Sequence, residues 1–225
     1  MDKKIISIAL DGPAGAGKST TADDVAARLG ILHLDTGALY RACALACLEA
    51  DLNRGDTEAV LTLMDETDID VAFVDGTQST LLNGLAVNSK IRTPEVSLWA
   101  SDVSAIPEVR LKLLDLQRDL AKEMSLVIDG RDIGSYVLPD ADIKIYLDAK
   151  PEVRAKRRLR ELQIKDPNIT YEKVYEDMIY RDKQDSAREI APLVIPEDAY
   201  VIDTSEHSIS DTTEVIIAYI NSKFS

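Results

Sequence analysis

The sequence has few of the residues that disulfide-bonded, metal-binding or exported proteins need. Its two cysteines, Cys43 and Cys47, stand four positions apart on an expected helix, where thiols are rarely placed for a disulfide, so we expect both in the core. Its two histidines, His33 and His207, do not have the spacing of metal ligands. Residues 1–12 hold too few apolar side chains for a membrane span and no small-residue cleavage site, which predicts a cytoplasmic protein.

Basic residues are outnumbered by acidic ones. The chain has 26 Lys and Arg residues against 40 Asp and Glu residues, a formal net charge of -14. A surface of this charge repels the phosphates of nucleic acids and anionic lipids, so we expect neither a nucleic acid nor a membrane as a partner. The absence of a conspicuous apolar heptad favours a monomer. Any anionic ligand must be held by a local positive site.

Short apolar or β-branched runs recur along the chain and end in acidic or small residues. They lie at 5–11, 31–35, 125–130, 143–148 and 200–203. Helical patterns lie between most of them; in the first, Ala22, Val25, Ala26 and Leu29 repeat with helical spacing, and Gly30 follows where a C-terminal cap belongs. Strands that alternate with helices predict an α/β fold with a five-stranded parallel sheet flanked by helices.

Residues 69–88 interrupt this alternation with short β-like runs. The pairs Asp-Gly at 75–76 and Asn-Gly at 83–84 are typical of hairpin turns. We therefore predict a small antiparallel β insertion in the α/β core. Pro94 and Pro107 then indicate the first turns of two helices.

The stretch LDGPAGAGKSTT at 10–21 places three glycines between an expected strand and an expected helix. Such a cluster needs either unusual dihedral angles or a close neighbour, because ordering glycine is entropically unfavourable. Gly12, Gly17, Lys18 and Ser19 match G-x-x-x-x-G-K-[ST], in which backbone N–H groups and the lysine hold a triphosphate and the hydroxyl ligates magnesium. The predicted ATP-binding residues are Gly12, Ala14, Gly15, Ala16, Gly17, Lys18, Ser19 and Thr20, with Ser19 as the magnesium ligand.

Other interpretations of this stretch are weaker. A glycine-rich turn with an incidental lysine does not explain the strand and helix on either side. The glycine order differs from the G-x-G-x-x-G of dinucleotide-binding folds. No N-K-x-D stretch is present to read guanine. The motif alone leaves open whether the phosphoryl group goes to water or to an acceptor.

A local excess of positive charge follows the fourth expected strand. Residues 150–165 carry seven basic and two acidic side chains. A solvated helix is one explanation, but the contrast with the acidic chain favours a lid whose arginines cover phosphates.

Two further charged groups have alternative interpretations when each is taken alone. Arg181 and Asp185 have helical spacing with Arg188, which is typical of surface ion pairs. Arg131 and Asp132 follow the end of an expected strand, where either a turn or a ligand site of an open α/β sheet can lie.

Taken together, these segments resemble bacterial cytidylate kinases. The matching stretches are GPAGAGKST at 12–20, LDTGALYR at 34–41, IRTPEV at 91–96, DGRDIG at 129–134, the Arg-rich segment 154–160 and RDKQDSAR at 181–188. The resemblance covers nearly the whole chain and includes the β insertion, which adenylate kinase-like enzymes lack. It implies a P-loop NTPase fold with a mobile Arg-rich lid, and transfer of the γ-phosphoryl group of ATP to CMP or dCMP.

The resemblance also implies which residues line the monophosphate site. They are Thr36, Tyr40, Arg41, Ser101, Arg110, Asp129, Arg131, Asp132, Arg181, Asp185 and Arg188. The arginines would hold the α-phosphate. Ser101, Arg110 and Asp132 would read the cytosine, and Asp185 with Arg181 would contact the ribose or deoxyribose.

Catalysis by such an enzyme requires alignment and charge neutralisation but no general base, because a phosphate acceptor is already ionised at neutral pH. This agrees with many arginines and no catalytic histidine. The residues expected to neutralise the transferred group are Lys18, Arg131, Arg157 and Arg188, and Arg157 and Arg158 would lie in the lid over ATP.

The implied organisation is a kinase core of residues 1–65 and 121–225, with a lid at 150–170 and an inserted monophosphate-binding region at 66–120. Two alternatives remain. One is another P-loop small-molecule kinase, which the β insertion and the arginine set disfavour. The other is a nucleotide-switched ATP-binding module that hydrolyses ATP slowly.

Overall fold

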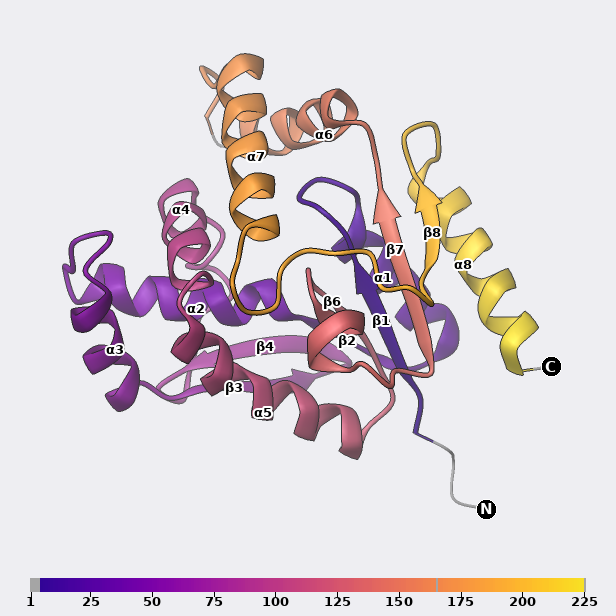
Figure 1. Cartoon of the computed structure of the whole chain (residues 1–225), viewed down its shortest axis with the longest axis horizontal. Coiled ribbons are helices and arrows are strands. Elements are labelled where there is room, and N and C mark those ends of the chain that lie inside the picture. The colour runs from indigo at the N-terminus through magenta and orange to yellow at the C-terminus, as the bar shows by residue number, and fades with distance from the viewer. Residues whose placement is uncertain (1–4, 165, 225) are drawn as a thin grey trace. The chain divides into compact units, whose positions relative to one another are not determined.

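A computed structural model describes residues 5–164 and 166–224 (Figure 1). The chain forms two compact units. The first unit holds residues 31–126 with the described part of 1–6, and the second holds residues 7–30 and 127–225.

The second unit carries most of the large sheet. Its elements are β1 (Ser7–Asp11), α1 (Lys18–Leu29), β6 (Leu126–Asp129), the π-helix η1 (Ile133–Val137), β7 (Ile143–Asp148), α6 (Pro151–Gln163), α7 (Tyr171–Ser186), β8 (Tyr200–Asp203) and α8 (Ile209–Phe224). The five-stranded parallel sheet has the order β2-β6-β1-β7-β8, with β2 being Leu32–Asp35. This confirms the predicted α/β P-loop fold and all five predicted strands.

The strands of the second unit are apolar along their length and acidic at their carboxyl ends. Ile8, Leu10, Ile145 and Leu147 are completely or almost completely buried. In the parallel register Asp11 is level with Tyr146, so the last residue of β1 and the end of β7 lie at the same edge of the sheet. Ligands of open α/β sheets bind at this edge.

The first unit contains the small sheet and the α-helices that follow it. Its elements after β2 are α2 (Thr36–Glu49), α3 (Thr57–Glu66), β3 (Ile69–Val74), β4 (Thr77–Leu82), β5 (Leu85–Ala86), α4 (Pro94–Val103) and α5 (Pro107–Glu123). Strands β3, β4 and β5 are antiparallel neighbours. The residues of both predicted turns, 75–76 and 83–84, have the positive φ angles of tight hairpins, which confirms the β insertion.

Helix α2 supplies much of the core of the first unit. It packs against α4, and Cys43 and Cys47 are buried in it as free thiols. Burial raises the pKa of Cys43 to about 12 and that of Cys47 to about 11, so both remain protonated and unreactive. The expectation that both cysteines lie in the core is confirmed. The predicted division at 66–120 stays a prediction.

Among the helices of the described residues, none is both long enough and apolar enough to cross a membrane.

Candidate active site

The glycine-rich loop joins β1 to α1, and its backbone packs closely against the backbone of β7. A Cβ atom on Gly12 would lie 2.0 Å from the carbonyl oxygen of Leu147, and Gly12, Gly15 and Gly17 all have positive φ angles. Both physical reasons expected for the glycine cluster are therefore present. Of the described side chains, none caps α1, whose first turn contains no acidic residue. This helix terminus suits an anion.

Lys18 lies in the first turn of α1 and is only 5% exposed. Its Nζ donates to the carbonyl oxygen of Pro13 at 2.8 Å, so the side chain curls back over the loop. Burial and the nearby charge of Arg131 lower the pKa of the Lys18 ammonium group to about 7. A bound phosphate would reverse this shift, because an adjacent negative charge favours the protonated form.

Ser19 and Asp129 bring two oxygen ligands together from distant parts of the chain. The Ser19 hydroxyl donates to Asp129 Oδ2 at 2.9 Å, and Asp129 is the buried last residue of β6. Magnesium in phosphate-transfer sites is held by few protein oxygens together with substrate phosphates. A hydroxyl beside one carboxylate fits that donor set.

The buried carboxylate of Asp185 contacts two arginines, Arg131 after β6 and Arg188 after α7. Arg131 Nε donates to Asp185 Oδ2 at 2.9 Å, and Arg188 donates to the other oxygen of Asp185. Asp185 is 1% exposed, so these charges are not a surface ion-pair ladder. Burial alone would raise the pKa of Asp185, but the charges of Arg131, Arg188 and Arg181 outweigh it and lower this pKa.

Helix α6 begins the predicted lid, and two of its arginines are tied to the rest of the second unit. Arg154 is buried and donates to the carbonyl oxygen of Ala14 in the glycine-rich loop at 3.0 Å and to Asp182 of α7 at 2.6 Å. Arg157 donates to the hydroxyl and carbonyl oxygens of Thr204 at 3.0 and 2.6 Å. Arg158 instead pairs with Glu161 on the exposed surface. Closure of the lid over ATP stays a prediction.

The first unit holds the other predicted acceptor residues in two groups. In one, Arg41 donates to Asp35 Oδ2 at 2.6 Å and Arg92 donates to the same oxygen at 3.3 Å. Asp35 also caps α2, the helix that begins with Thr36.

The second group surrounds the buried Arg110. Its guanidinium carbon lies 5.2 Å from the centre of the Tyr40 ring, and its NH1 nitrogen donates to the carbonyl oxygen of Ser104 at 3.1 Å. The Ser104 hydroxyl donates to the carbonyl oxygen of Ser101. The predicted cytosine readers Ser101 and Arg110 are thus linked through Ser104.

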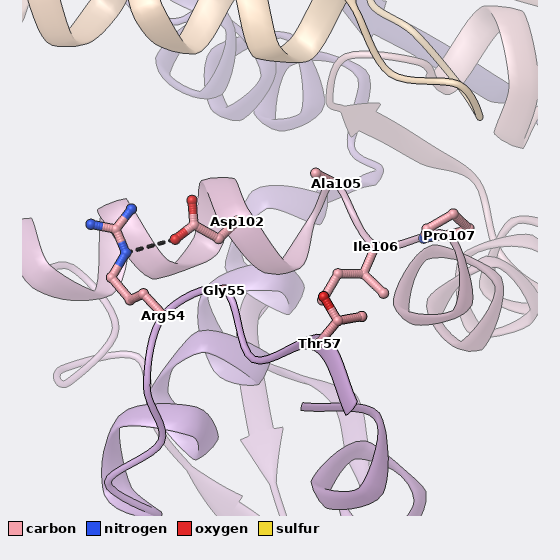
Figure 2. A pocket seen from close by; sticks show the side chains of 7 residues that line it. All are labelled: Arg54, Gly55, Thr57, Asp102, Ala105, Ile106 and Pro107. Atoms are coloured by element: carbon pink, nitrogen blue, oxygen red, sulfur yellow. Dashed lines mark hydrogen bonds and ion pairs between the residues drawn. The ribbon is translucent and has the colours of Figure 1, made fainter. Parts of the chain in front are cut away.

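The hollow in Figure 2 lies within the first unit and contains none of the predicted site residues. It has a volume of about 520 Å³ and is lined by Arg54, Gly55, Thr57, Asp102, Ala105, Ile106 and Pro107. The Arg54–Asp102 ion pair, at 2.6 Å, is partly exposed and therefore contributes little stability.

Sequence reasoning did not single out three charged residues of the second unit, two of them buried and the third, Asp182, partly buried. They are Asp11, Arg154 and Asp182. Arg154 lies inside the Arg-rich segment and Asp11 directly precedes the glycine-rich loop, so position was the only available signal. Asp11 accepts from an amide 122 residues away, and Arg154 donates to Ala14 and Asp182, which are 140 and 28 residues away along the chain.

Comparison with known proteins agrees with this chemistry. The sequence model of the cytidylate kinase family matches residues 8–222. The chain belongs to the cytidylate kinase family. Cytidylate kinase of Caldicellulosiruptor saccharolyticus is 48% identical over 214 residues, which cover 95% of each chain. Cytidylate kinase of Clostridioides difficile is 46% identical over 95% of this chain and 97% of its own.

A solved structure shows the fold independently of close sequence similarity. The crystal structure of an uncharacterized protein from Eubacterium ventriosum has a TM-score of 0.56 and 15% identity, and the match covers 96% of this chain and 99% of that one. This likeness concerns the fold alone. Membership of the cytidylate kinase family confirms the resemblance stated from the sequence motifs.

Proposed function

We propose that the protein transfers the γ-phosphoryl group of ATP to CMP and dCMP. The observation that carries this proposal is that Lys18 of the glycine-rich loop lies near Arg131, which itself pairs with the buried Asp185 in the same unit. The loop provides the donor side, and the arginines provide charge for an acceptor phosphate. Family membership supports a nucleoside monophosphate kinase over a slow ATP-hydrolysing switch.

The proposed mechanism is in-line transfer supported by charge neutralisation. Lys18 would stabilise charge on the transferred group, together with Arg131, Arg157 and Arg188. Ser19 and Asp129 would hold magnesium, which supplies further neutralisation of the phosphates when bound. Because the acceptor phosphate is already ionised, no side chain has to remove a proton from it.

The acceptor roles follow the family resemblance. We assign the α-phosphate to the arginines, cytosine to Ser101, Arg110 and Asp132, and the sugar to Asp185 with Arg181. Thr36, Tyr40 and Arg41 keep the acceptor roles that family resemblance implies. We further propose a cytoplasmic monomer that acts on small molecules. The net negative charge argues against a nucleic acid or a membrane as a partner.

An acceptor panel tests the proposed function. Purified protein with ATP and magnesium should release ADP rapidly when CMP or dCMP is present, and slowly with AMP, UMP or shikimate. Coupled measurement of ADP, with separation of the products, identifies the acceptor. Preference for another acceptor would contradict the substrate assignment, and release independent of every acceptor would favour the ATP-binding switch.

Replacing Asp132 by alanine should reduce the preference for CMP over UMP by about 10-fold to 100-fold, because the loss of one charged hydrogen bond has this effect. Asp132 is buried, and a carboxylate there can accept from the cytosine amine but opposes the uracil carbonyl. The ratio of kcat/KM values for CMP and UMP measures the change. The control is Asp140→Ala on the exposed segment after η1, which should keep the native ratio. Equal use of CMP and UMP by the native protein would exclude this role.

A further inference from the structure

Both carboxylate oxygens of Asp11 are used to hold one short backbone segment. Oδ1 accepts from the Ile133 amide at 2.8 Å, and Oδ2 accepts from the Gly134 amide at 2.7 Å. Asp11 is the last residue of β1 and is 1% exposed. The two amides start η1, directly after Arg131 and Asp132.

The loop that carries Arg131 and Asp132 is thereby attached to β1 on both sides. Before it, the Gly130 amide donates to the carbonyl oxygen of Leu10 at 3.1 Å. After it, the Ile133 amide donates to Asp11. Only Arg131 and Asp132 lie between these two attachments, so the backbone of this pair has little freedom to move away from the end of β1.

Gly134 allows the start of η1 to pack closely against Asp11 and Lys144. A Cβ atom at Gly134 would lie 3.4 Å from Asp11 Oδ2 and 3.2 Å from the Lys144 side chain. The charged groups that face Asp11 are Lys18 from α1 and Asp132 from the loop, with the titratable Tyr146 on β7. Burial raises the pKa of the Asp11 carboxyl to about 7 despite the two amide hydrogen bonds. An asparagine would pack equally well, but it offers a single oxygen.

We propose that Asp11 is a positioning residue that holds Arg131 and Asp132 in place for the acceptor nucleotide through the Ile133 and Gly134 amides. The proposal rests on the proposed phosphorylation of CMP and extends it to a residue that does not contact the nucleotide. Because Asp11 directly precedes the glycine-rich loop, one residue would connect the donor loop through its backbone and the acceptor loop through its side chain.

The kinetic test is Asp11→Asn in the full chain. Its amide nitrogen would face one of the two N–H groups, so we expect the KM for CMP to rise by about 10-fold to 100-fold and the KM for ATP to change by less than about 3-fold. Gly134→Ala should act in the same direction, and it serves if Asp11→Asn does not fold. The control Asp142→Asn loses a carboxylate that accepts from the Ser7 amide at 3.0 Å on the exposed side, and should keep both KM values.

A second measurement does not depend on activity. In the native protein the amide resonances of Ile133 and Gly134 should shift together as Asp11 titrates, at a pH above the ordinary range of a carboxyl because burial raises its pKa, and this shared shift should be lost in Asp11→Asn. Equal increases of both KM values, or amides that do not titrate together, would overturn the proposal. If the native protein failed to phosphorylate CMP but the two amides still shifted together, the proposed function would be contradicted. The attachment of the loop to Asp11 would then still be supported.

Discussion

Replacing Lys18 by alanine is expected to lower turnover with CMP, and with every other acceptor, by about 100-fold to 1000-fold, the effect of removing one preorganised charge from a transition state. Lys18 is the first residue of α1, and its side chain lies over the glycine-rich loop, where the transferred phosphoryl group would gain charge. Steady-state assays with saturating ATP and CMP measure the loss.

This loss should not arise from unfolding. Because the pKa of Lys18 is lowered to about 7 from 10.5, the unfolded chain binds a proton between these values that the folded chain does not, so this lysine makes stability rise with pH over that window. At neutral pH the buried lysine therefore destabilises the folded state, and an alanine at this position does not. The melting temperature of ligand-free Lys18→Ala should therefore equal or exceed that of the native protein.

A matched control is Lys173→Ala, which removes an exposed lysine that pairs with Asp177 one turn away on α7. Turnover of this control should stay within about 2-fold of the native value, because exposed pairs of this kind contribute little. If Lys18→Ala kept more than a tenth of native turnover, the assignment of charge neutralisation to this lysine would be wrong.

Asp185→Asn is expected to lower the free energy of unfolding by about 3–5 kcal/mol, since breaking a buried ion pair leaves an uncompensated charge. The substitution would leave Arg131 and Arg188 without the carboxylate that both contact. Turnover of CMP should fall by about 100-fold, because the arginines that we propose bind the acceptor phosphate would no longer be held in place. Urea denaturation and steady-state kinetics measure the two effects.

The sign of the pH dependence follows from the lowered pKa of Asp185. Its folded pKa lies below the ordinary 3.8, so its stabilisation is present above that value and is lost as the pH falls through the folded pKa. Asp185→Asn should remove this part of the acid destabilisation. Inorganic phosphate should stabilise the variant more than the native protein, because it supplies negative charge to the same arginines.

The control for Asp185 is Asp177→Asn on the same helix, where the carboxylate is partly exposed and pairs with Lys173. It should change the free energy of unfolding by less than about 1 kcal/mol. A similar loss of unfolding free energy in both variants would indicate a general effect on α7 and not the loss of the carboxylate that holds the two arginines.

Much of the fold follows from patterns of neighbouring residues. The five predicted strands are all present, and the Asp-Gly and Asn-Gly pairs form the expected turns. The predicted helix starts at Pro94 and Pro107 are also confirmed. These predictions succeeded because turn and cap preferences act over a few residues, where the sequence shows both partners.

The candidate site was predictable only where a local motif carries the chemistry. The loop with Lys18 and Ser19 has such a motif, whereas Asp11 shows no periodicity or spacing that indicates its partners. Asp11 bonds to an amide 122 positions away, and Arg154 to a carbonyl oxygen 140 positions away. Helical spacing predicted Arg181, Asp185 and Arg188 on one helix face, but α7 ends at Ser186, and Arg188 contacts Asp185 from the segment after the helix. The same spacing also fitted an exposed ion-pair ladder, which the burial of Asp185 excludes.

By itself, the sequence determined the elements, the phosphate-binding loop and, through family membership, the class of reaction. The tertiary structure decided which group each buried carboxylate binds. Asp185 binds two arginines, Asp11 binds amides of the loop after β6, and Asp129 accepts from the Ser19 hydroxyl. The physical reason is that a strand or turn depends on adjacent residues, whereas a buried charge is stable only beside a partner that chain folding brings to it.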